Sequence, residues 1–414
     1  MQDTIGLSQR AKELKSSVTL AVTARVGQLK EAGKDVIGFG AGEPDFDTPE
    51  AIKEAAIESL KGGATHYMPV AGPGAAREAV AEKLGRENGV SCTADEVLIT
   101  TGAKHAVYLG MQALADPGDE VIVPTPAWVS YPPIVELCGA KVVEVPGAVE
   151  NDFKITPEQL EEAITDKTKV MLFNSPSNPC GTMYSPEEIR GLAEVIARHE
   201  RVVLISDEIY EHLIYGPTAH LSPGSIEAIA DRVVTVNGLS KAYAMTGWRV
   251  GYASAPGVAV SREGGRSVLA KAMAKLQGQM TSHITSFCYA ALVEALRHGG
   301  KKVEEMRGVF ARRAELIYAL VRKMPGVACP KPTGAFYVFP DISAYFGKTT
   351  GDGRKVDSAL GFAEALLEEA LVAVVPGEDF GECARKHVRL SFACSEADIE
   401  RGCGRIAEWL GTLR

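Results

Sequence analysis

A lysine and an arginine stand eight positions apart in the segment NGLSKAYAMTGWRVGY, residues 237–252. The apolar run 233–236 leads into this segment, so Lys241 should lie at the end of a buried strand. Burial and a nearby like charge both lower a lysine pKa, and such a lysine is a nucleophile toward carbonyl carbon. The alternative is a surface loop in which Lys241 and Arg249 are two solvated cations, and this stretch alone does not decide between the two.

Candidate binding residues follow two other apolar runs. Gly102, Ala103 and Lys104 open a helix after the first run, and the free N–H groups of a helix N-terminus favour an anion, above all a phosphate. Trp128 follows the second run, where its indole could cover a flat ligand. A core tryptophan is the alternative for Trp128, and an ordinary glycine-containing loop is the alternative for residues 102–104.

Polar groups also follow the fourth and fifth runs. Asn178 lies in NSPSNPCGT, where two X-Pro bonds, candidates for a cis peptide, restrict the backbone and could present the amide to a ligand. A plain turn explains the same residues. In VVLISDEIYEH, Asp207 should lie partly desolvated at the sheet edge, where a carboxylate needs a partner, and Tyr210 could present its phenol to the same space.

Taken together, these groups match one ligand. A phosphate, a flat ring, a basic ring nitrogen, a phenolate oxygen and an aldehyde would use all of them, and pyridoxal 5′-phosphate carries these groups. We therefore predict that Lys241 bonds the cofactor aldehyde. Arg249 is predicted to bind the phosphate and to help keep Lys241 neutral.

The elements that would position these side chains alternate along the chain. Apolar runs predict strands at 96–100, 120–124, 141–145, 169–174, 202–206 and 232–237, and helical patterns predict helices near 103–115, 129–138, 157–164, 186–199 and 223–230. This alternation predicts a mostly parallel sheet, in which ligands bind beyond the carboxyl ends of the strands. Residues 264–411 read as a second, α+β region.

The composition predicts an ordinary soluble protein of 414 residues, with 46% hydrophobic and 23% charged residues. A net charge of −9 without a long basic run argues against nucleic-acid binding. No membrane-spanning apolar stretch and no signal-peptide core are present, so a cytoplasmic location is expected. The eight cysteines form no CxxC pair and no Cys/His cluster with zinc spacing, so no metal site is predicted.

Five segments together resemble the class I aminotransferases, which belong to fold type I of the pyridoxal-phosphate enzymes. AGEPDFDTP, NSPSNPCGT, SDEIYEH, SKAYAMTGWRVGY and VRLSFA stand in the order and spacing of that family. The resemblance implies an α/β fold with a large, mostly parallel seven-stranded sheet and a smaller α+β domain built from both chain ends. The implied limits are 1–44 for an N-terminal segment joining the small domain, 45–300 for the large cofactor-binding domain and 301–414 for the small domain.

The resemblance also implies a role for each matched residue. Lys241 bonds the cofactor and moves a proton between the substrate Cα and the cofactor C4′, and Asp207 keeps the ring nitrogen protonated. Tyr210 and Asn178 bond the phenolate oxygen, and Trp128 stacks on the ring. The residues round the phosphate are Ala103, Lys104, Ser240 and Arg249. Tyr67 resembles the tyrosine that reaches the phosphate of the partner subunit, so a homodimer with shared sites is implied.

Substrate residues follow from the same resemblance. Arg389 resembles the arginine that clamps the substrate α-carboxylate, a task that suits bidentate geometry, with Gly42, Asn178 and Trp128 at the same end. One bacterial subgroup of aspartate aminotransferases has a site for the distal carboxylate of the substrate. Lys104 resembles the lysine of that site, and its matching neighbours are Lys15, Ser17 and Thr19. A lysine like Lys15 is linked to prephenate use in that subgroup. Without the family, Lys104 reads as a cation near the phosphate.

The main hypothesis is therefore an aspartate:2-oxoglutarate aminotransferase with a ping-pong cycle. Its nearest alternatives keep the cofactor and act on prephenate or arogenate, aromatic amino acids or alanine. A non-catalytic effector domain of a transcription regulator would carry a DNA-binding helix-turn-helix ahead of this fold, whereas here the fold begins almost at residue 1. A nucleotide-binding α/β protein would carry GxGxxG or GxxxxGK[ST], and neither follows the first strand.

Overall fold

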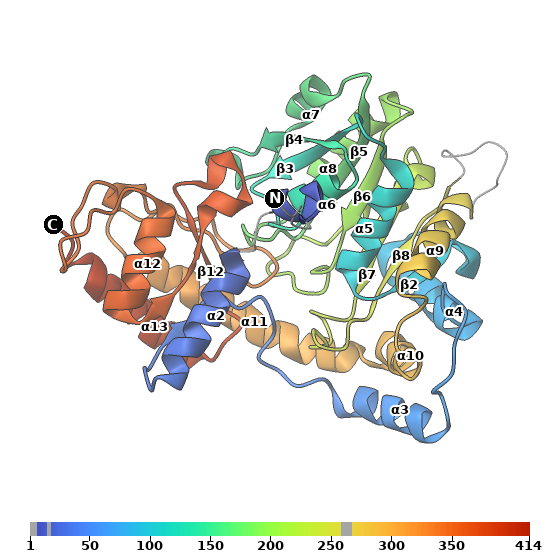
Figure 1. Ribbon diagram of the computed structural model, residues 1–414, viewed down its shortest axis with the longest axis horizontal. Helices are drawn as coiled ribbons and strands as arrows, with labels where there is room; N and C mark the ends of the chain where they lie inside the picture. The colour runs from blue at the N-terminus through green and yellow to red at the C-terminus, as the bar shows by residue number, and fades with distance from the viewer. Residues whose placement is uncertain (1–5, 15–17, 258–266) are drawn as a thin grey trace, which may run out of the picture.

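A seven-stranded β-sheet lies at the centre of the larger lobe of the computed structural model, which describes residues 6–14, 18–257 and 267–414 (Figure 1). The strand order is β2-β8-β7-β6-β5-β3-β4. The strands are β2 (Val97–Thr100), β3 (Glu120–Thr125), β4 (Lys141–Pro146), β5 (Thr168–Asn174), β6 (Val203–Asp207), β7 (Val233–Gly238) and β8 (Gly251–Ser254). All neighbours pair in parallel except β8, which is antiparallel to β2 and β7. The six strands predicted from apolar runs are confirmed.

Helices cover both faces of this sheet because the strands are apolar on both sides. In β6, Val203 and Ile205 face one side and Leu204 faces the other. The first side packs against α5 (Ala103–Leu114), α6 (Tyr131–Leu137) and α9 (Val268–Met280), and the second against α7 (Pro157–Ala163) and α8 (Pro186–Arg198). The β2–β8 end is covered by α3 (Glu50–Lys61), α4 (Gly74–Lys83) and α10 (Cys288–His298).

The helix predicted near 223–230 is wrong. Two separate 3-10 turns stand there, Pro223–Ser225 and Ala230–Arg232. At Gly224 the backbone packs directly on β7, and a Cβ at this position would lie 2.7 Å from Oγ1 of Thr235. The segment therefore follows the strand closely, and its Pro-Gly pair disfavours a helix.

The smaller lobe combines the C-terminal part of the chain, from about residue 300 on, with the N-terminal segment (Figure 1). Its helices are α11 (Gly300–Val321), α12 (Ala359–Ala370) and α13 (Glu396–Leu410), beside α2 (Val18–Glu31) from the N-terminal end. The short helix α1 (Gln9–Glu13) precedes α2 in the chain. A three-stranded sheet has the order β11 (Val375–Pro376), β12 (Val388–Ser391) and β9 (Tyr337–Val338), and β1 (Ile37–Gly38) pairs with β10 (Val372–Ala373).

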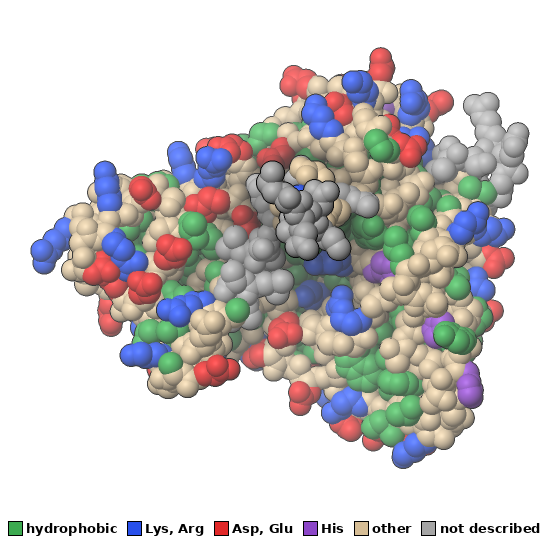
Figure 2. All heavy atoms as spheres, viewed as in Figure 1, with side chains coloured by type: hydrophobic (Ala, Val, Ile, Leu, Met, Phe, Trp, Pro, Cys, Tyr) green, Lys and Arg blue, Asp and Glu red, His purple; other side chains and the backbone are tan. Residues whose placement is uncertain are grey.

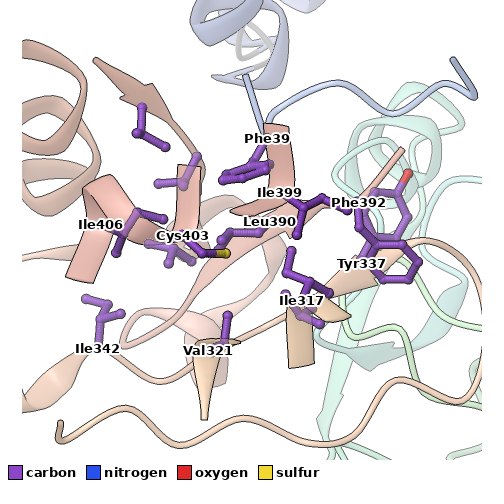
Figure 3. Close-up of a cluster of buried hydrophobic side chains, with 14 of the residues drawn as sticks. Phe39, Ile317, Val321, Tyr337, Ile342, Leu390, Phe392, Ile399, Cys403 and Ile406 are labelled. Atoms are coloured by element: carbon purple, nitrogen blue, oxygen red, sulfur yellow. The ribbon is translucent and has the colours of Figure 1, made fainter. Parts of the chain in front are cut away.

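One apolar cluster holds this lobe together (Figure 3). Phe39 from the N-terminal segment points into it beside Leu390 and Ile399 from the C-terminal part of the chain. The parallel pairing of β1 with β10 explains why these distant segments share a core. The domain limits 1–44, 45–300 and 301–414 remain a prediction. Within the described residues, no helix is both long and apolar enough to cross a membrane.

Candidate active site

A pocket of about 400 Å³ lies beyond the carboxyl ends of the parallel strands. The residues predicted from the sequence that line it are Gly42, Ala103, Lys104, Trp128, Asn178, Asp207, Tyr210, Ser240, Lys241, Arg249 and Arg389. Figure 2 shows Lys and Arg side chains in the hollow near the centre of the drawn face. The pocket thus brings together groups from five loops of the sheet and from both chain ends.

Lys241 follows β7, and its Nζ donates a hydrogen bond to the carbonyl oxygen of Gly42. Removal of its ammonium from water lowers the pKa of Lys241 to about 8. The carboxylate of Glu43 works against this shift, whereas the charges of Arg389 and Arg249 add to it. Near neutral pH, Lys241 therefore has a neutral, nucleophilic fraction that an ordinary lysine lacks.

Asp207 ends β6 and is buried rather than partly exposed as predicted. The hydroxyl of Tyr131 donates to its Oδ2 at 2.9 Å, and the backbone N–H of Ile209 donates to its Oδ1 at 3.3 Å. Burial raises the pKa of Asp207 to about 6, and these two hydrogen bonds limit the rise. The site thus holds a desolvated carboxylate that gains from a positively charged partner.

A buried arginine lies at the other end of the pocket. Arg389 donates to Oδ1 of Asn178 at 2.9 Å and to the carbonyl oxygen of Gly40 at 3.0 Å. Its guanidinium lies 4.6 Å from the ring centroid of Tyr337, whose hydroxyl is 2.9 Å from that of Tyr210. Within the described part of the chain, Nε of Arg389 has no hydrogen-bond partner. A buried guanidinium with a donor to spare is suited to a carboxylate.

Gly102 and Arg249 form a cradle at the N-terminus of α5. Gly102 has a φ of 78°, and a Cβ there would lie 2.5 Å from Nη2 of Arg249. Only glycine combines this backbone conformation with so close an approach. Arg249 also donates from Nη1 to the carbonyl oxygen of Thr246 at 2.8 Å. The guanidinium and the first N–H groups of α5 together make an anion site, although Gly102 itself does not line the pocket.

Lys104 and Trp128 lie against each other, with Nζ of Lys104 4.8 Å from the indole centroid. Burial lowers the pKa of Lys104, and the charge of Arg249 lowers it further. The indole also meets Tyr131 edge-on, with ring centroids 5.3 Å apart. A flat apolar wall and a cation thus stand side by side at the pocket rim.

The structure does not bring every predicted residue to this pocket. Tyr67 is 91% exposed outside it, edge-on to the ring of His283. Lys15 and Ser17 lie outside the described residues, and the side chain of Thr19 does as well. Both X-Pro bonds of NSPSNPCGT, Ser175–Pro176 and Asn178–Pro179, are cis.

The sequence analysis missed nine of the residues that line this pocket, among them Tyr131, Tyr337 and Glu43. Tyr131 follows Trp128 by three positions at the start of α6, so the same loop contained the signal. Tyr337 belongs to a two-residue strand, and Glu43 lies in a loop without periodicity. For Glu43 only its position in the motif AGEPDFDTP could have marked it.

Comparison with known proteins places the chain in a family. The family model described as "Aminotransferase class I and II" matches residues 34–406. The chain belongs to this aminotransferase family. The resemblance, the fold class and the transaminase class predicted from the sequence are thereby confirmed.

Relatives of this aminotransferase match it over nearly its whole length. It is 45% identical to the aspartate/prephenate aminotransferase of Cereibacter sphaeroides, over 98% of this chain and 99% of that protein. It is 44% identical to the aspartate aminotransferase of Bacillus subtilis, over 98% of each. Two solved structures are similar. The aspartate aminotransferase of Rhizobium meliloti has a TM-score of 0.93 at 41% identity, covering 99% of this chain and 100% of that one. That of Thermus thermophilus with maleate has a TM-score of 0.89 at 42% identity, covering 98% and 100%.

Proposed function

We propose that this aminotransferase uses pyridoxal 5′-phosphate to move the amino group of L-aspartate to 2-oxoglutarate. The observation that carries the proposal is the meeting, in one pocket, of Lys241 with its lowered pKa, buried Asp207 and buried Arg389. Aspartate and 2-oxoglutarate are both dicarboxylates, and the pocket offers two separate cations, Arg389 and Lys104, beyond the cradle of Arg249. Relatives with the name aspartate aminotransferase support this choice.

The side chains present fit the cofactor. Any residue larger than glycine at position 102 would clash with the guanidinium of Arg249. This close approach leaves the first N–H groups of α5 and the guanidinium free to bind one anion, such as a phosphate. Asp207 would hold a proton at the ring nitrogen, because a positive partner offsets the desolvation of its carboxylate. Tyr210 would bond the ring oxygen, and Trp128 would cover the ring.

When bound, the cofactor supplies an electron sink that stabilises negative charge at the substrate α-carbon. Lys241 would hold the cofactor through its aldehyde in the resting enzyme. Once the amino group of the substrate has replaced Nζ at the aldehyde, the freed amine of Lys241 would be the group that accepts the α-proton and returns it to the cofactor C4′, a role that a pKa of about 8 permits in both directions near neutral pH. Arg389 orients the substrate by its α-carboxylate, with Asn178 holding the guanidinium and Gly42 lining the same end.

Lys104 binds the distal carboxylate, assisted by Lys15, Ser17 and Thr19 from the N-terminal segment. A second substrate, prephenate, is favoured by one observation. The relative that is 45% identical is named an aspartate/prephenate aminotransferase, and Lys15 stands at the position that the sequence resemblance links to prephenate use.

The proposed assembly is a homodimer with shared active sites. Tyr67 supports it, since a tyrosine that is 91% exposed on this chain is available to reach the phosphate of a partner's cofactor. The exposed apolar residues Ile57, Leu60 and Met280 offer surface for such a contact. Sedimentation of the purified protein tests the dimer, and a monomer at working concentration would refute it.

The test of the function is an absorbance spectrum of the protein with bound cofactor. L-Aspartate, L-tyrosine, L-alanine and L-arogenate are added separately, followed by 2-oxoglutarate. We expect the band of the lysine-bound cofactor to disappear fastest with aspartate and to return with 2-oxoglutarate. Lys241→Ala should show neither the band nor turnover while remaining folded. A wild-type band that ignores aspartate would discard the substrate, and no band at all would discard the cofactor site.

A further inference from the structure

The turn that follows β6 carries acidic residues on two sides. Asp207 and Tyr210 line the pocket, whereas Glu208 and Glu211 do not and are buried in the protein. A buried carboxylate is stable only with hydrogen-bond or ionic partners. The side of the turn away from the pocket must therefore be built from polar groups.

Glu211 meets the end of α4. Both Nζ of Lys83, which is completely buried, and Nδ2 of Asn88 donate to its carboxylate. Lys83 also donates to Oδ1 of Asn88 at 2.7 Å. Lys83 ends α4 and Asn88 ends the π-helical turn Leu84–Asn88 that continues it. Because a π-helix brings residues five apart together, this rare turn directs both side chains to Glu211.

Glu208 has its own set of partners. Its carboxylate accepts from the hydroxyls of Ser206 at 2.9 Å and Ser222 at 2.8 Å, and from Nδ2 of Asn88 at 3.3 Å. Nε2 of His220 lies 3.0 Å from the same carboxylate. Burial would lower the pKa of His220, but the hydrogen bond and charge of Glu208 outweigh burial and raise it. When His220 is protonated, its charge and that of Lys83 balance the charges of Glu208 and Glu211.

Metal binding is the competing explanation of this cluster. Glu208, Glu211 and His220 bring three possible ligand atoms within 4.8 Å of one another. The ammonium of Lys83, however, already bonds Glu211, so the cluster contains its own cation. A structural role for these charges is the better explanation.

The turn that carries Glu208 and Glu211 also contacts the segment that carries Lys241. The ring of His212 meets the ring of Tyr243 edge-on, with centroids 6.4 Å apart, and Tyr243 is two residues after Lys241. The backbone N–H of Glu208 donates to the carbonyl oxygen of Val236 in β7 at 2.9 Å. The ends of β6 and β7 are therefore held from the same side.

We propose that Lys83, Asn88, Glu208, Glu211 and His220 are positioning residues, a buried charge cluster that fixes the turn presenting Asp207 and Tyr210 to the cofactor ring. The inference rests on the proposed function, because it assigns the cluster a role toward the cofactor. The two carboxylates anchor the turn at 208 and 211, and the two pocket residues alternate with them at 207 and 210. A shift of the turn would move Asp207 and Tyr210 together.

The test uses Glu208→Gln in the full-length enzyme with bound pyridoxal 5′-phosphate. Glutamine has the volume of glutamate, but its amide nitrogen is a donor and would face the donor groups that now bond the carboxylate. The turn should therefore shift. We expect the pH midpoint of the lysine-bound cofactor band to move by roughly half a unit or more. We also expect kcat to fall roughly tenfold with little change in KM, because Arg389 is untouched.

Two further variants keep the test decisive if Glu208→Gln does not fold. Lys83→Met with Glu211→Leu removes the ion pair without leaving a buried charge unpaired, so this double variant should fold. The double variant should still move the pH midpoint of the lysine-bound cofactor band. The matched control is Arg232→Met at the amino end of β7, where the buried guanidinium bonds the carbonyl oxygens of Ile196 and His199. It should lower the melting temperature without moving the band.

The outcomes separate the two proposals. A wild-type protein without the band would refute the proposed function. A normal wild-type band with midpoints unmoved in both cluster variants would refute the positioning role alone. Equal shifts in the cluster variants and in Arg232→Met would also refute it, since general destabilisation would then explain the result.

Discussion

The hydroxyl of Thr246 donates a hydrogen bond of 2.7 Å to Oε2 of Glu43, and this contact holds a carboxylate in the same pocket as Lys241. The next residue back along the chain, Gly42, accepts a hydrogen bond from that lysine. Burial is the largest influence on the pKa of Lys241 and lowers it. The charge of Glu43 raises this pKa, whereas the charge of Arg389 lowers it further. The protonation of the nucleophile depends on a residue of the N-terminal loop.

Replacing Glu43 by glutamine should lower the pKa of Lys241 below about 8, by roughly half a unit to one unit for the loss of one nearby charge. The rate at which cofactor-free enzyme captures pyridoxal 5′-phosphate depends on the neutral amine, so its pH midpoint reports this pKa. Arg389→Met is the control of opposite sign, and its midpoint should rise. If both variants keep the pH midpoint of the wild-type protein, the charges of Glu43 and Arg389 do not set the pKa of Lys241.

Tyr131→Phe should raise the pKa of Asp207 above about 6, because it removes the donor that bonds Oδ2. A hydrogen bond to a charged group is worth about 1.5–3 kcal/mol, which corresponds to roughly one to two pKa units. The acid limb of the pH profile of kcat/KM should therefore move toward neutral pH. Tyr184→Phe, which removes a buried hydroxyl bonded to the backbone of Ile155, is the control and should leave that limb in place.

The position of the pocket could be predicted from the sequence because a parallel sheet brings the ends of its strands together. Asp207 and Lys241 each follow an apolar run, so the strand pattern alone assigned them to one edge of the sheet. Strand β8 has four residues, with a glycine and an alanine among them, and carries no clear alternation. It was implied only by the family's seven-stranded sheet.

The remaining site residues depend on tertiary contacts that no local pattern encodes. Tyr337 reaches Tyr210 from a strand of two residues, 127 positions away. Lys83 and Glu211 pair across 128 positions, and in the sequence each reads as a surface charge. Their burial follows from the packing of α4 against the sheet, which periodicity cannot specify.

Lys104→Ala should reduce kcat/KM for aspartate more than for alanine, since alanine lacks the distal carboxylate that the lysine is proposed to bind. A lost charge-assisted hydrogen bond of about 1.5–3 kcal/mol corresponds to a roughly 10- to 100-fold difference in the ratio. Steady-state kinetics with both donors measure it. Lys61→Ala, at an exposed position in α3, is the control. Equal losses with both donors would reduce Lys104 to a neighbour of the phosphate.

Gly102→Ala should weaken cofactor binding without unfolding the protein. The new Cβ would meet Nη2 of Arg249 at 2.5 Å and push the guanidinium away from the N-terminus of α5. Gly63→Ala is a matched control, because Gly63 also has a positive φ, 89°, but has nothing within 4 Å of a Cβ. Both variants should lose stability from backbone strain, on the order of 1–3 kcal/mol at Gly102, whose φ of 78° and ψ of 162° suit glycine alone. Only Gly102→Ala should also raise the Kd for pyridoxal 5′-phosphate. Equal Kd values for Gly102→Ala and Gly63→Ala would show that Gly102 and Arg249 do not form the phosphate site.

His220 should make the stability of the protein depend on pH in a predictable direction. Glu208, assisted by Glu211 and opposed by burial and Lys83, raises the folded-state pKa of His220 above the unfolded value of about 6.5. Its contribution is therefore complete below about pH 6.5 and is lost as the pH rises through the folded pKa. His220→Gln should lower the urea midpoint of unfolding more at pH 6 than at pH 8.

His212, whose ring lies 3.3 Å from the carboxylate of Glu211, provides the control of opposite sign beside the cluster. Burial lowers the pKa of His212, although Glu211 and Glu87 partly oppose the shift. Its contribution is complete above about pH 6.5 and is lost as the pH falls through the lower folded pKa. His212→Gln should therefore lower the urea midpoint more at pH 8 than at pH 5. The same pH dependence in both variants would show that Glu208 does not hold a proton on His220, and the charge balance of the cluster would have to be revised.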